Sequence, residues 1–89
     1  MQASGASHAA TGSITANTDS ALTLTPPSSD VLISNLSGVP FYVRINAEVS
    51  ASVYDFMVQD GERAWITDVM VETVHVYGNA TSGLNVVGW

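Results

Sequence analysis

The sequence predicts an all-β fold, a small antiparallel β-sandwich or jelly-roll-like barrel with an extended N-terminal arm. Three observations support this prediction. Short runs rich in β-branched and aromatic residues alternate with turn-forming residues from residue 30 onward, and no segment sustains a helical apolar period. The runs are about five residues long, with turns every 8–12 residues or so, a spacing typical of sandwiches and small barrels.

The first segment, residues 1–19, consists mostly of Ala, Ser, Gly and Thr. Its first charge is Asp19, and Ile14 is its only bulky apolar residue after Met1. Such a composition buries too little surface to offset the entropy of ordering, so the segment is expected to be disordered on its own and ordered only where something holds it. We interpret residues 1–19 as an extended arm that reaches a partner, with packing on its own domain as the alternative. Residues 20–89 are then a single β-sandwich domain.

The first two strands are expected at residues 20–25 and 30–34. Residues 20–25 alternate with period two and are rich in Thr, which suits a half-buried strand. Pro26 and Pro27 are expected to end this strand, because proline cannot donate to a ladder. Residues 35–38 then form a turn.

Residues 39–46 form the most clearly patterned strand. Phe41, Val43 and Ile45 fall on one face of it, and Tyr42 and Arg44 fall on the other. Residues 47–55 follow as an irregular loop with room for a short helical turn.

Two hairpins are expected in the last third of the chain. Residues 56–58 lead into the Asp60-Gly61 turn, and residues 63–67 form the return strand. Residues 71–77 and 84–87 form the second pair, joined by a loop over residues 78–83. Because neighbouring hairpins pair antiparallel strands, the sheets are expected to be antiparallel.

Composition excludes several classes of function. The chain has 89 residues, no cysteine, and 11% charged residues against about 25% in an average soluble domain. Its net charge is −6, with two arginines and no lysine, so binding to nucleic acid or to anionic membranes is not expected. There is no basic, apolar leader and no apolar run of about 20 residues. So little charge is typical of a subunit buried in an assembly, which favours a homo-oligomer.

No catalytic, cofactor-binding or metal-binding constellation is expected. His8 and His75 are too far apart in sequence to form a local ligand pair, and most carboxylates fall in or beside turns, where aspartates bond to nearby amides. The chain has no nucleophile elbow and no phosphate loop. We interpret His75 as a surface or interface residue, with a pH-sensitive contact in an assembly as the alternative. No enzymatic activity is predicted.

Outward aromatic residues are the remaining candidates for binding. Trp65 alternates with Ala64 and Ile66, so it points away from that strand's core face. Tryptophan and tyrosine in such positions often anchor interfaces. A place on the second face of a sandwich, or a sugar platform of Trp65, Tyr42 and Tyr77, is the alternative. The predicted partner-binding residues in the arm and among the aromatics are Ile14, Tyr42, Trp65, Tyr77 and Trp89.

Motifs between residues 30 and 89 carry a resemblance to a known family. They are Ile33-Ser-Asn-Leu-Ser-Gly-Val-Pro-Phe-Tyr-Val-Arg-Ile-Asn46, Val58-Gln-Asp-Gly-Glu62 and Thr81-Ser-Gly-Leu-Asn-Val86. In this order they resemble small β-sandwich or jelly-roll head decoration (cement) proteins of tailed bacteriophages. The arm lies outside the resemblance.

The resemblance implies a non-enzymatic virion component, made in the host cytoplasm and located on the outer capsid surface. It also implies a homotrimer that binds the major capsid protein and stabilises capsomer contacts. A tail, neck or baseplate subunit of a phage is the alternative, followed by a carbohydrate-binding module.

Overall fold

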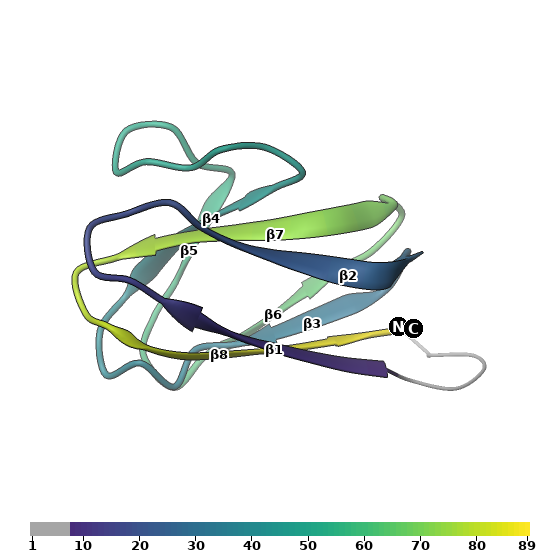
Figure 1. Ribbon diagram of the computed structural model, residues 1–89, viewed down its shortest axis with the longest axis horizontal. Coiled ribbons are helices and arrows are strands. Elements are labelled where there is room, and N and C mark those ends of the chain that lie inside the picture. The colour runs from purple at the N-terminus through teal and green to yellow at the C-terminus, as the bar shows by residue number, and fades with distance from the viewer. Residues whose placement is uncertain (1–7) are drawn as a thin grey trace.

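The structure, a computed structural model, describes the backbone of residues 8–89 and the side chains of residues 11–89. The expected arm therefore lies partly outside the described residues. The described chain is all-β, as predicted, and forms two antiparallel four-stranded sheets packed together as a sandwich (Figure 1). Its strands are β1 His8–Ile14, β2 Ser20–Ser28, β3 Val31–Ser34, β4 Phe41–Ile45, β5 Phe56–Val58, β6 Arg63–Ile66, β7 Val71–Gly78 and β8 Ser82–Gly88.

The strands are ordered β1-β8-β3-β6 in the first sheet and β2-β7-β4-β5 in the second. We call these sheet A and sheet B. Successive strands mostly alternate between the sheets. Within residues 8–89, β4 and β5 are the one pair of strands adjacent in sequence that is also hydrogen-bonded. Both predicted hairpins are therefore wrong. The Asp60-Gly61 turn and the loop after Gly78 each carry the chain from sheet B to sheet A, because β6 and β8 both pair with β3.

Apolar side chains on the inner faces of the two sheets form the core. The predicted alternation is confirmed for β4, where Phe41 and Val43 are buried, and β3 buries Val31 and Ile33 in the same way. They are joined in one cluster by Ile14, Leu24, Val58, Val71, Val74, Val76, Leu84 and Val86. Burial of these side chains is the main favourable contribution to folding. The chain has no cysteine, so no disulfide adds to it.

Strand β2 continues through Pro26 and Pro27 to Ser28, so the prediction that the prolines end it is wrong. The β2–β7 register shifts between Thr23 and Ser28, which leaves the two prolines outside the regular ladder. Strand β2 is also an edge strand. Proline is tolerated at edges and bulges because no ladder hydrogen bond is lost there.

The segment expected to be an arm differs from that expectation where the structure describes it. Residues 8–14 form β1, which pairs with β8 along its length, from His8 opposite Gly88 to Ile14 opposite Ser82. Backbone groups make this ladder, so a low-complexity sequence suffices for it. Ile14 is 1% exposed and belongs to the core, which makes it a structural residue of its own domain and not a partner contact.

A buried asparagine braces one end of the sandwich. The Asn35 side chain is fully buried, and its Nδ2 donates to the carbonyl oxygens of Val39 at 2.9 Å and Val58 at 2.8 Å. Its Oδ1 accepts from the amide and the hydroxyl of Ser37, at 3.0 and 2.7 Å. The Asn35 backbone bonds to Glu62 and Gly61. One residue thus joins the end of β3, the start of β4, the end of β5 and the following turn.

Replacing Ile14 by Ala is expected to lower the free energy of unfolding by about 2–5 kcal/mol, because it leaves a cavity in the core. Urea denaturation measures this loss. The matched control is Ser13→Ala on the exposed face of β1, which is expected to change stability by less than about 0.5 kcal/mol. Equal, small effects of both substitutions would contradict the placement of Ile14 in the core.

Replacing Asn35 by Ala is expected to cost about 2–4 kcal/mol, because the carbonyl oxygens of Val39 and Val58 lose their buried donor. Asn85→Ala on the exposed side of β8 is the control and is expected to be nearly neutral. Thermal or urea unfolding followed by tryptophan fluorescence compares the two. An Asn35→Ala variant as stable as the wild-type protein would rule out the brace.

Candidate functional site

The outer face of sheet A carries an apolar cluster that we call the tryptophan face: Leu32, Trp65, Val87 and Trp89. Leu32 is opposite Trp65 on one neighbouring strand and opposite Val87 on the other. Strand alternation places Trp89 on the same side as Val87, since Val86 is buried in the core. The four side chains therefore form one continuous surface across β6, β3 and the end of β8.

The two tryptophans of this face contact each other. Their ring centroids are 5.5 Å apart at an interplanar angle of 32°. Trp65 is still 47% exposed, and the predicted outward orientation of this residue is confirmed. Polar side chains border the cluster at the next positions along the strands, where Ser34 pairs with Arg63 and Asn85. An exposed apolar cluster with a polar rim on so small a domain is typical of a protein–protein interface.

The outer face of sheet B carries a second cluster, which we call the tyrosine face: Tyr42, Tyr54, Met57 and Tyr77. Tyr42 on β4 lies opposite Tyr77 on β7 and Met57 on β5. Its ring centroid is 4.6 Å from that of Tyr54 and 6.4 Å from that of Tyr77. Both distances are within the range of favourable aromatic pairs.

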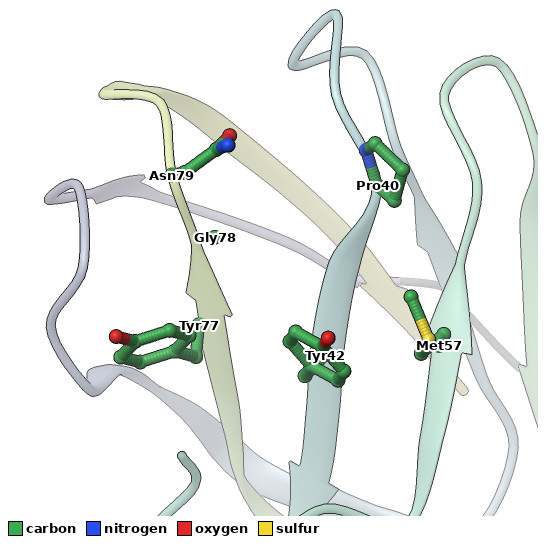
Figure 2. Close-up of a pocket in the computed structure, with 6 residues that line it drawn as sticks. All are labelled: Pro40, Tyr42, Met57, Tyr77, Gly78 and Asn79. Atoms are coloured by element: carbon green, nitrogen blue, oxygen red, sulfur yellow. The ribbon is translucent and has the colours of Figure 1, made fainter. Parts of the chain in front are cut away.

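The tyrosine face is hollowed. A cavity of about 210 Å³ is lined by Pro40, Tyr42, Met57, Tyr77, Gly78 and Asn79. In Figure 2, Tyr77, Tyr42 and Met57 lie in a row across three neighbouring strands. Asn79, just after the end of β7, and Pro40, just before the start of β4, lie beside this row. None of the six carries a charge, so this site is suited to a small uncharged group.

The structure divides the predicted aromatic set between opposite outer faces. Trp65 and Trp89 come together on sheet A, while Tyr42 and Tyr77 come together on sheet B. A sugar platform that includes Trp65 with Tyr42 and Tyr77 is therefore wrong. Sequence reasoning did not include Leu32 and Val87 on sheet A, or Pro40, Met57 and Asn79 around the hollow. These residues could be found only from the register between paired strands, and the two wrongly predicted hairpins assigned the wrong strand partners.

Asp19, which precedes β2, forms a polar cluster with His75 and Thr73 on β7. The Asp19 carboxylate lies 2.9 Å from His75 Nδ1, and His75 Nε2 lies 3.1 Å from Thr73 Oγ1, so the cluster has an acid, an imidazole and a hydroxyl in that order. This order occurs in hydrolytic triads, but a triad also needs amide donors beside the nucleophile. Here the amides of Glu72 and Thr73 already donate to Asn46 Oδ1, so these two amides are not available to bind an oxyanion beside the Thr73 hydroxyl.

The same cluster has a clear structural role. Asp19 Oδ1 also accepts from the Val49 amide at 3.3 Å. Asp19 therefore joins the β1–β2 connection to β7 and to the loop over residues 47–55, which is irregular as expected. The predicted surface or interface position of His75 is refined, since its side chain is 15% exposed and lies against Asp19.

Residues 11–89 contain no group of three or more His, Cys, Asp or Glu side chains arranged to hold a metal ion. Over the described chain, no helix is long and apolar enough to cross a membrane.

Asp19→Ala and His75→Ala are each expected to destabilise the fold by about 1–2 kcal/mol, because each removes the hydrogen bond between these two partly buried side chains. A double-mutant cycle by urea denaturation is expected to give a coupling energy of about 1 kcal/mol between them. The control cycle pairs Asp19→Ala with Asn85→Ala on the other sheet and is expected to be additive. Additivity of Asp19 with His75 would contradict the pair.

Comparison of the chain with models of known protein families, with curated proteins and with solved structures finds no match.

Proposed function

We propose that the chain is a non-enzymatic virion structural protein, a capsid decoration (cement) protein that binds the outer phage head and stabilises contacts between capsomers. The observation that carries this proposal is the tryptophan face, an exposed apolar surface on a domain with very little charge. The order of motifs from residue 30 to residue 89 supports the same class of protein.

The finer fold assignment is also a proposal. A jelly roll has eight strands in two sheets, built from two Greek keys. The strand orders β1-β8-β3-β6 and β2-β7-β4-β5 support it, because the chain passes repeatedly between the sheets and its first and last strands pair. This topology suits a rigid subunit, since most contacts join residues that are distant in sequence.

The tryptophan face supplies the chemistry of attachment. Two indole rings and two aliphatic side chains remove apolar area from water when a flat partner surface covers them. Because three of its four residues, Leu32, Trp65 and Val87, lie on strands, little side-chain or backbone entropy is lost on binding. A homotrimer would present three such faces to a symmetric shell, and simultaneous contacts raise the apparent affinity well above that of one face.

Trp65→Ala is expected to weaken head binding at least about tenfold, because the most exposed aromatic side chain of the tryptophan face is lost. Co-sedimentation with undecorated heads from the phage whose genome encodes the chain measures the occupancy. The matched control is Tyr54→Ala, which removes a similarly exposed aromatic side chain from the opposite outer face. Unchanged occupancy for a folded Trp65→Ala protein would remove the support for attachment through this face.

The mass of the protein in solution tests the class of virion component. A trimer agrees with decoration at symmetry axes of the head. A sixfold ring that fails to bind heads would instead favour a tail, neck or baseplate subunit.

A further inference from the structure

We propose that the hollow on the tyrosine face is a binding site for an uncharged saccharide, with one pyranose ring seated against Tyr42 and Tyr77. The site is separate from the tryptophan face, because its residues come from β4, β5 and β7 on the other sheet. It extends beyond the proposed attachment to a head, which does not involve this face.

The size of the hollow sets the size of the ligand group. Its volume of about 210 Å³ is below the roughly 300–1,000 Å³ of pockets that enclose drug-sized ligands. It opens on the outer face of a sheet, so a single ring can enter while the rest of a longer chain remains in solvent. This matches a terminal or internal sugar of an oligosaccharide.

The lining has partners for both surfaces of a sugar ring, the apolar C–H face and the rim of hydroxyl groups. One face of a pyranose consists largely of C–H bonds, and the electron-rich face of Tyr77 is suited to contact it. Tyr42, whose ring is tilted by 55° to that of Tyr77, lines the hollow beside it. Met57 and Pro40 extend this apolar floor (Figure 2). The rim of the ring carries hydroxyl groups. The Tyr42 hydroxyl and the exposed Asn79 amide, which both donates and accepts, are suited to bind them.

Charge narrows the class of saccharide. No residue of the lining is charged, so nothing there would balance a phosphate, sulfate or carboxylate group. The net charge of −6 further disfavours anionic sugars. Proline-rich peptides also dock on aromatic residues, but they require a groove that follows several residues of an extended chain. The six lining residues here surround one hollow instead.

The site is rigid because regular backbone holds it. Tyr42 is paired with Tyr77 on one side and with Met57 on the other. Gly78 lies so close to β4 that an added Cβ would be 3.2 Å from the Cβ of Phe41. Its carbonyl accepts from the Asn17 amide at 2.7 Å, which fixes the end of β7 beside the hollow. A site held in this way loses little entropy when it binds.

The test titrates the full-length protein with glucose, galactose, mannose, N-acetylglucosamine and their short neutral oligomers, followed by amide chemical shifts. Binding by at least one of them, with shifts centred on Tyr42, Met57 and Asn79, is expected. Tyr77→Ala is expected to weaken that binding at least about tenfold. Tyr77→Phe keeps the ring and is expected to retain most of the binding affinity. Asn79→Ala removes the exposed amide, which lies outside the core, and is expected to weaken binding.

Trp65→Ala is the matched control from the other sheet and is expected to bind the sugar as the wild-type protein does. Head co-sedimentation of the Tyr77 variants separates this inference from the proposed function, because it is expected to be unchanged. The proposal is overturned if no neutral saccharide gives localised shifts on the folded wild-type protein. It is equally overturned if a proline-rich peptide or an anionic sugar alone binds the hollow, or if Tyr77→Ala and Asn79→Ala both bind with wild-type affinity.

Discussion

The hydrogen bonds of buried Asn35 are the constraint on which the rest of the structure depends. Strands β5 and β6 follow each other in sequence but belong to different sheets, so the end of the sandwich where the chain crosses must be held. The Asn35 side chain bonds to the start of β4 and the end of β5, and its backbone bonds to the turn before β6. These bonds set how β4 lies against β5 and how β3 lies against β6. The tyrosine face includes residues of β4 and β5, and the tryptophan face includes residues of β3 and β6.

Each sheet uses its inner face for the shared core and leaves its outer face for other purposes. The outer face of sheet A is dominated by indole rings and aliphatic side chains, which suit a large and flat partner. The outer face of sheet B has phenol rings around a small hollow with an amide at its edge, which suit a small polar ring. Because the surfaces are on opposite sides of a thin sandwich, a subunit attached through one would expose the other. Under the two proposals made above, one face would attach the subunit to a shell and the other would remain free to bind a neutral saccharide.

Most of the strands could be predicted from local pattern, whereas their partners could not. The alternation of Phe41 and Val43 with Tyr42 and Arg44 identified both the strand and its buried face. The Asp60-Gly61 signal located a turn but not its destination, because a turn's sequence encodes local dihedral angles and not which sheet receives the next strand. The low-complexity start of the chain looked unable to order itself. It joins β8 because a ladder uses backbone groups, which composition does not describe.

The sequence by itself determined an all-β chain with little charge, outward aromatic residues, and a pattern that buries every second side chain. It determined these properties because they follow from side-chain chemistry and from the two-residue period of a strand. Only the tertiary structure decided that the aromatic residues form two separate surfaces, that Ile14 belongs to the core and that Asn35 is a buried brace. Each of these depends on the register between strands far apart in sequence. Register is set by how both sheets pack at once, so no local segment contains it.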